Sequence, residues 1–138
     1  MELTKITVQT LINAPIEKVW KCFTSPEHIT QWNFAADTWH SPKAENDLRV
    51  GGKFNYRMEA KDGSFGFDFW GTYSAIVLNQ RINYTMGDDR KAEITFVAKG
   101  NQTEVIETFE AETENPVELQ QGGWQAILNN FKKHAETI

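Results

Sequence analysis

The clearest pattern in the chain is a strict alternation of apolar and polar residues that follows Gly51-Gly52. Phe54, Tyr56 and Met58 occupy one face there, and charged or amide side chains occupy the other. A two-residue period is typical of a β-strand with one buried face. Turn-forming residues separate further apolar stretches, so we expect strands at 3–12, 65–78, 81–86, 91–98 and 103–111. Short turns between successive strands favour an antiparallel meander.

The stretch 65–78 is too long to bury one face throughout. Phe65, Phe67 and Phe69 share one parity, whereas Trp70 and Ile76 share the other. Since one parity cannot face the core along the whole stretch, we expect a bulge or bend near Gly71.

Helical spacing appears twice near the N-terminus. Apolar residues from Ile16 to Phe23 recur at i, i+3, i+4 and i+7, which places them on one face of a helix. A second, short helix is expected after Ser25, with Ser25 as its cap and Pro26 at its first position.

The chain ends with a third helical pattern, which predicts a long helix over 116–136. Asn115 is a suitable cap, with Pro116 at the first position. The apolar stripe of this helix is wide enough to cover a sheet, and it consists of Val117, Trp124, Ile127, Leu128, Phe131 and Ala135. Gly122-Gly123 inside it indicates close approach to the sheet, a kink that opens space, or a tolerated imperfection.

No periodicity is visible from residue 33 to residue 50. We expect a long irregular segment there, containing Trp39 and His40. Long irregular loops in compact domains are often functional lids. A solvated surface excursion is the alternative.

Composition predicts one globular domain over residues 1–138, since 40% of the residues are hydrophobic and 24% are charged. A net charge of −5 without a basic run argues against a nucleic-acid partner. No apolar run is long enough for a membrane span, and we expect a cytoplasmic protein. The only cysteine, Cys22, excludes an internal disulfide framework and a cysteine-based zinc site.

No catalytic motif is present, so we name no catalytic residue, no metal ligand and no cofactor. His134 lies near a helix C-terminus, where we expect a structural role, and His28 lies in the first turn of a short helix. No compact cluster of metal ligands is apparent. Cys22 has no evident base beside it, and we expect it to be structural or incidental. His40 is a candidate only because it lies in the possible lid.

Glu107 is the most interesting carboxylate. It shares parity with Val105 and Phe109, and hence with the more apolar face of its strand. If that face points inward, Glu107 enters the interior, where burial raises a carboxyl pKa unless a partner offsets it. If Ile106 and Thr108 point inward instead, Glu107 is solvated.

The predicted order is a strand, two short helices, about six more strands and a long C-terminal helix. With the segments at 13–20, 25–32, 47–54, 71–73 and 122–131, this order resembles the START/birch-pollen-allergen-like helix-grip (SRPBCC) superfamily. More narrowly, the chain resembles single-domain homologues of the C-terminal domain of the heat-shock-90 ATPase activator. The resemblance implies an α+β helix-grip fold, in which a curved antiparallel sheet wraps around the C-terminal helix.

The resemblance also implies a cavity between sheet and helix that takes a small hydrophobic molecule, lipid-like or polyketide-like. The alternatives are an adaptor for a chaperone-like protein partner and an enzyme that uses Glu107 or His40 in the same cavity. The candidate ligand-binding residues are mostly aromatic: Trp32, Trp39, His40, Phe54, Tyr56, Trp70, Phe96, Glu107, Phe109, Trp124, Leu128 and Phe131.

Overall fold

A computed structural model describes residues 3–138, which form seven strands and three helices. In chain order these are β1 (Lys5–Ile12), α1 (Ile16–Thr24), α2 (Pro26–Trp32), β2 (Trp39–Asn46), β3 (Lys53–Ala60), β4 (Gly66–Val77), β5 (Arg81–Met86), β6 (Lys91–Lys99), β7 (Gln102–Glu110) and α3 (Val117–Thr137).

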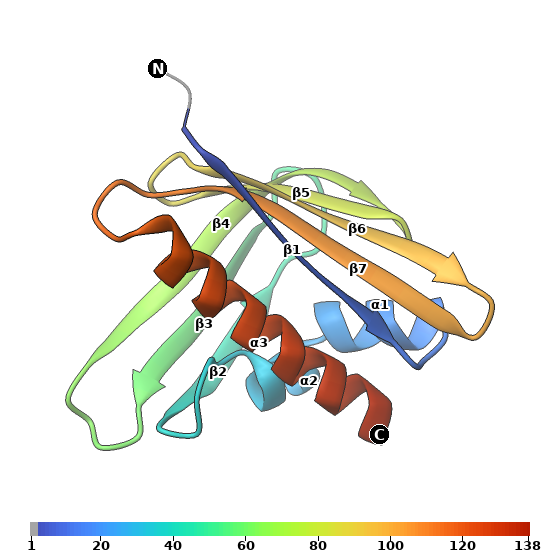
Figure 1. Ribbon diagram of the computed structural model, residues 1–138, viewed down its shortest axis with the longest axis horizontal. Helices are drawn as coiled ribbons and strands as arrows, with labels where there is room; N and C mark the ends of the chain where they lie inside the picture. Colours follow the sequence, from blue (N-terminus) through green and yellow to red (C-terminus); the bar gives the residue numbers. More distant parts are fainter. Residues whose placement is uncertain (1–2) are drawn as a thin grey trace.

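The strands make one antiparallel sheet in the order β1-β7-β6-β5-β4-β3-β2. The sheet curls, and α3 runs diagonally across its inner side, as Figure 1 shows. The two short helices, α1 and α2, lie against the C-terminal half of α3. The predicted helix-grip fold is confirmed.

The irregular segment expected over 33–50 is wrong for residues 39–46 and holds on either side of them. Residues 39–46 form β2, an edge strand paired with β3, and its register shifts between His40 and Lys43. Pro42 lies inside this shift, and a proline is tolerated in a sheet at an edge or a bulge. The shift breaks the alternation of side chains, which is why the sequence showed no period there.

The expected change of face in β4 occurs three residues later than predicted. The register with β5 shifts between Tyr73 and Ala75, so Phe69 and Tyr73 face inward before the shift and Ile76 does so after it. Gly71 has a different role. A Cβ atom there would lie 2.9 Å from the Phe54 ring, so only glycine lets the two strands and that ring approach so closely.

The start of α3 also differs from the expectation. Pro116 is the N-cap residue and no side chain caps the helix, whereas the backbone and amide nitrogens of Asn115 donate hydrogen bonds to Glu112. The close approach suggested for Gly122-Gly123 is wrong, because a Cβ atom at either position would meet nothing within 4 Å. The helix continues through both glycines.

The most tightly packed part of the interior lies where α1, α2 and the C-terminal half of α3 meet the sheet. Phe131 is fully buried there, with ring centroids 5.3 Å from Phe23 and 4.8 Å from Trp32. Trp20 and Phe96 continue this cluster, 5.2 Å apart. We call these five residues the packed end.

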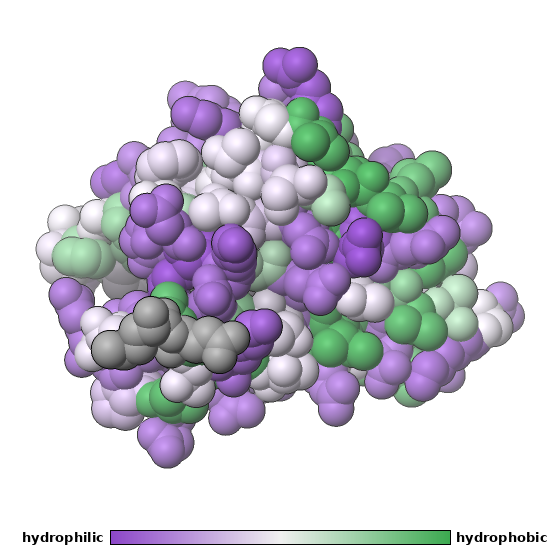
Figure 2. Space-filling model, turned by 90° about the horizontal axis from the view of Figure 1, so that it is seen from above, coloured by the Kyte–Doolittle hydropathy of each residue, from purple (hydrophilic) through white to green (hydrophobic). Residues whose placement is uncertain are grey.

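Polar residues cover most of the face shown in Figure 2, and hydrophobic residues gather toward one side of it. Within residues 3–138, no helix is both long and apolar enough to cross a membrane.

Candidate functional site

A cavity of about 270 Å³ lies between α3 and the inner side of the sheet. This volume is close to the lower end of the range of small-molecule pockets. The wall is mostly aromatic and aliphatic, and its residues come from all three helices and from four strands: Phe23, Thr24, Trp32, Asn33, Phe54, Tyr56, Met58, Phe67, Phe69, Tyr73, Ile82, Tyr84, Arg90, Glu107, Trp124 and Ile127.

Glu107 belongs to this wall. Alternate residues of β7 face inward, and Glu107 lies between the buried Val105 and Phe109 with only 8% of its surface exposed. Burial raises its pKa from the usual 4.5 to about 8, and it is the only cause of the shift. No charge or hydrogen bond among the described residues therefore offsets the burial. At neutral pH most molecules carry this carboxyl protonated, able to donate one hydrogen bond and accept another.

Three tyrosines, Tyr56, Tyr73 and Tyr84, belong to the wall of the cavity. Burial raises the pKa of Tyr84, and the charge of Glu107 raises it further, so these two side chains are close neighbours. Burial likewise raises the pKa of Tyr56, and that of Tyr73 to about 12. The Tyr73 hydroxyl donates to Asn46 Oδ1 at 2.6 Å. All three phenols stay neutral at physiological pH, which keeps the cavity apolar in character.

Arg90 brings the only basic side chain to the wall. Its Nε donates to Asp88 at 2.7 Å, and its Nη1 donates to the Glu110 carbonyl at 3.0 Å. These bonds hold the guanidinium against Asp88 and the Glu110 backbone. Burial alone accounts for the raised pKa of Glu107, so Arg90 does not offset it.

Asn33 supplies a second polar group without a partner. It follows directly after α2 and is 5% exposed, and its backbone nitrogen donates to the Ile29 carbonyl at 3.0 Å. Its side-chain Nδ2 is buried and has no hydrogen-bond partner within residues 3–138. A buried donor without a partner costs free energy, which a ligand acceptor would recover.

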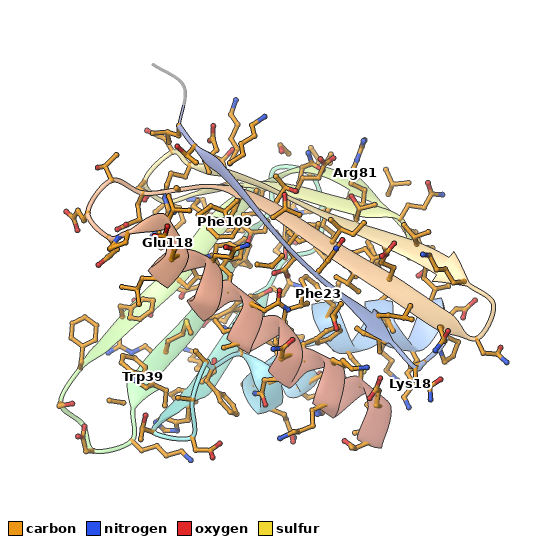
Figure 3. All side chains as sticks on the ribbon, viewed as in Figure 1. Lys18, Phe23, Trp39, Arg81, Phe109 and Glu118 are labelled. Carbon is orange, nitrogen blue, oxygen red and sulfur yellow. The ribbon has the colours of Figure 1, made fainter. Side chains whose placement is uncertain are left out.

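A groove of about 360 Å³ lies beside the cavity and shares Met58, Phe67, Trp124 and Ile127 with its wall. Trp39 also lines this groove and stacks edge-on against Phe65 at 5.9 Å. Figure 3 labels Trp39 beside the β3–β4 hairpin. The groove adjoins the cavity through these four shared residues. Phe65, beside Trp39, is 60% exposed.

Five of the twelve candidate residues line the cavity, and Trp39 lines only the groove. The five are Trp32, Phe54, Tyr56, Glu107 and Trp124. Three more, Phe96, Leu128 and Phe131, are buried in the core outside the wall. Phe109 lies behind the wall and supports it, because its ring stacks on Trp124 with centroids 3.8 Å apart.

Two candidates lie away from the cavity. Trp70 is 41% exposed on the other side of the sheet, where its ring covers Gly87 and Lys53 Nζ lies 5.5 Å above it. His40 is on β2, and its Nε2 lies 3.7 Å from the carboxylate of Glu59. Both side chains follow the parity of their strands outward, so neither reaches a ligand in the cavity.

Sequence reasoning missed several wall residues. Tyr84 and Ile82 alternate with polar residues along β5, so the two-residue period could have found them. Tyr73 required knowledge of the register shift in β4. Asn33 and Arg90 lie in connections, where no period exists.

No compact cluster of possible metal ligands was expected from the sequence, yet the structure brings three residues of that kind together. The Cys22 sulfur and one ring nitrogen each of His28 and His134 all lie within 4.8 Å of one another. They come from three different helices, and 106 residues separate the two histidines. No spacing in the sequence indicates this arrangement.

Comparisons with known proteins support a single family. The model of the family described as "Activator of Hsp90 ATPase homolog 1-like protein" matches residues 13–136. No curated protein matches the chain.

Three solved structures are similar over nearly the whole chain. An AHSA1-like protein from Aeromonas hydrophila is 42% identical, with a TM-score of 0.91 over 96% of this chain and 92% of that one. A protein from Cytophaga hutchinsonii is 52% identical, with a TM-score of 0.83 and the same two coverages. A protein from Chromobacterium violaceum is 25% identical, with a TM-score of 0.86 over 98% of this chain and 99% of that one.

Proposed function

We propose, from the premise that the chain belongs to the family of Activator of Hsp90 ATPase homolog 1-like proteins, that this protein binds a small, neutral and mostly apolar ligand. The observation that carries the proposal is the pair of unpartnered polar groups, Glu107 and Asn33, in the wall of an otherwise aromatic cavity. A protein that only needed a filled core would gain stability by replacing both with apolar residues.

The two groups favour a ligand with oxygen acceptors. A protonated Glu107 donates through its hydroxyl, and Asn33 donates through Nδ2, so a carbonyl or hydroxyl oxygen of the ligand would satisfy each. An anionic ligand is disfavoured, because it would lose its water in a mostly apolar cavity whose one basic side chain, Arg90, is already paired with Asp88. Burial of rings against Trp124 and Phe69 would supply most of the binding free energy.

Prodan, a neutral fluorescent naphthalene with one carbonyl oxygen, tests this proposal. We expect saturable binding with a blue-shifted emission, because the probe leaves water for an apolar cavity. Ile127 lies in the wall that the cavity and the groove share, so Ile127→Trp fills part of the space beside it. This variant should abolish prodan binding. Val97→Trp, on an exposed position of β6, is the matched control and should leave binding unchanged.

A second pair of variants tests the role of the carboxyl. Glu107→Gln keeps a donor and should bind prodan nearly as well as the wild type. Glu107→Leu removes the donor and should weaken binding about 2–10-fold, the effect of one neutral hydrogen bond. Equal binding by the wild type and Ile127→Trp would refute the cavity as the site.

A chaperone-like protein partner is the second candidate function. The exposed apolar rim around the groove, with Phe65 and Leu119, supports it, as does the description of the family. In an ATPase assay with purified Hsp90, Phe65→Ser and Leu119→Ser should each reduce any stimulation by this protein. Glu107→Leu, which changes the cavity but not the groove, should leave that stimulation intact although it weakens prodan binding. A wild type without effect on the ATPase rate would refute this candidate.

A further inference from the structure

Cys22, His28 and His134 form a cluster that the proposed ligand site does not use. None of the three lines the cavity or the groove. The cluster lies where α1, α2 and the last turn of α3 meet, beside the packed end. Cys22 is 1% exposed at the bottom of the cluster, and both histidines are half-buried above it.

The two imidazoles point their ring nitrogens at each other. His28 Nδ1 and His134 Nε2 are 3.0 Å apart, and the ring planes meet at 61°. In this arrangement one ring donates its N–H to the lone pair of the other. Two nitrogens and a cysteine sulfur within 4.8 Å of one another are the donor types that zinc prefers.

We propose that these three residues bind one zinc ion, with the fourth coordination position open to solvent. In a tetrahedral zinc site with Zn–N near 2.0–2.1 Å and Zn–S near 2.3 Å, donor atoms lie about 3.3–3.6 Å apart. The 3.0 Å between His28 Nδ1 and His134 Nε2 is close to these values. The Cys22 sulfur lies within 4.8 Å of a nitrogen of each ring, so coordination would draw it closer. The half-exposed histidines leave an entry path, and the deeply buried thiol provides the soft ligand.

The backbone around the cluster is fixed, which favours binding by a preformed set of ligands. The Cys22 carbonyl accepts a hydrogen bond from Trp32 Nε1 at 2.9 Å, and the His28 backbone nitrogen donates to the Ser25 carbonyl at 3.0 Å. Each ligand also belongs to a helix. Coordination would therefore join α1, α2 and α3 without a large rearrangement.

Zinc binding removes a proton from Cys22 and changes the tautomer of one histidine. Coordination releases the thiol proton of Cys22 to solvent and forms the zinc–sulfur bond. The ring proton shared by His28 and His134 moves to the opposite nitrogen of its own ring, so both imidazoles coordinate as neutral ligands. One proton is released for each zinc ion bound, and no redox step occurs.

Cobalt(II) replaces zinc as a spectroscopic probe in the test. The purified protein is first stripped with a chelator and then titrated with Co²⁺. We expect one equivalent to bind, with a thiolate-to-cobalt charge-transfer band in the near ultraviolet and with visible bands of tetrahedral intensity. One equivalent of Zn²⁺ should remove these bands and raise the melting temperature.

Variants assign the ligands. Cys22→Ser should lose the charge-transfer band. Loss of a residue that only supports a metal ligand weakens metal binding about 10–100-fold. His28→Gln and His134→Gln each remove a ligand, so each should weaken Co²⁺ binding by more than that. His40→Gln, a histidine outside the cluster, is the matched control and should bind as the wild type does.

Cys22 is buried, so Cys22→Ser can fail to fold. Both histidines are partly exposed, so the histidine variants should fold and still test the proposal. Absence of a charge-transfer band in the wild type would overturn the proposal. Equal Co²⁺ affinity in the wild type, His28→Gln and His134→Gln would overturn it as well, since the metal would then bind elsewhere. Prodan binding is independent of these outcomes.

Discussion

The two halves of α3 face different neighbours. Near the C-terminal end, Phe131 is enclosed by Phe23 and Trp32 and has no exposed surface. Closer to the N-terminal end, Trp124 stacks on Phe109 with one face and borders the cavity with another part of its ring. The C-terminal half of α3 therefore packs into the core, whereas its N-terminal half borders the cavity.

The difference indicates how a helix-grip fold can hold both a stable core and a ligand cavity. The packed end fixes the position of α3, so the half of the helix above the cavity does not need to fill the space beneath it. We call Tyr56, Tyr84, Glu107 and Trp124 the cavity end. Void space and an unpartnered carboxyl both reduce stability, and the packed end compensates for them.

The largest expected effect is that of Phe131→Ala. Truncating a fully buried phenylalanine should lower the free energy of unfolding by about 3–5 kcal/mol, much of a domain's usual total of about 5–15 kcal/mol. Urea denaturation measures the change. Leu119→Ala, at an exposed position of the same helix, is the control and should change it by less than about 0.5 kcal/mol. A loss below about 1 kcal/mol for Phe131→Ala, roughly the scale of surface substitutions, would remove the distinction between the two ends.

Trp124→Ala should cost less, although tryptophan is larger. Its ring is half-buried and already borders a void, so we expect a loss of about 1–3 kcal/mol, below the range for a fully enclosed ring. Prodan binding should weaken as the wall is lost. Trp124→Phe keeps a ring on Phe109 and should retain most of the stability. A loss equal to that of Phe131→Ala would show that both ends are equally packed.

The stability of the cavity end should depend on pH through Glu107. Between the usual pKa of 4.5 and the folded value of about 8, the folded protein holds a proton that the unfolded chain releases. The free energy of unfolding should therefore fall as pH rises through this window, by up to about 1.4 kcal/mol per pH unit.

Glu107→Gln isolates this contribution, because it is neutral at every pH and nearly the same shape. Denaturation at pH 5, 6.5 and 8 should show a smaller decline with pH in the variant, which should be the more stable protein at pH 8. Parallel curves for the wild type and the variant would mean that Glu107 is already ionised in the folded state.

The smallest expected effects on stability are those of alanine substitutions at two glycines, and they should have opposite signs. Gly123→Ala places a methyl group in open space on a helix, so it should raise stability by up to about 1 kcal/mol through helix propensity. Gly71→Ala places the same group 2.7 Å from the Thr85 carbonyl oxygen and 2.9 Å from the Phe54 ring, so it should lower stability. Thermal melting compares the two. Destabilisation by Gly123→Ala would contradict the open space around Gly123.

Local periodicity accounts for what could be predicted from the sequence. The strands at the centre of the sheet and the stripes of α1 and α3 each repeat within a few residues, so they were found along with the fold. The same period put Glu107 on the more apolar face of its strand, together with Val105 and Phe109, but the sequence left open which face points inward. The structure shows that this face is the buried one.

The remaining features depend on contacts between distant parts of the chain. β2 is held by pairing with β3 across a register shift, and its own residues show no alternation. Asn33 reaches the cavity because of the direction in which the chain leaves α2. Cys22 and His134 meet only because α1 and α3 pack together, which no local pattern indicates.

Chemical-shift mapping tests the central claim most directly. Titration of the ¹⁵N-labelled protein with prodan should shift the backbone signals of Asn33, Tyr84 and Glu107 and the indole signal of Trp124. The signals of Phe131 and His134 should move little, because neither residue lines the cavity or the groove. Shifts confined to exposed positions such as Leu78 and Val97, or shifts of equal size at both ends of α3, would contradict the account.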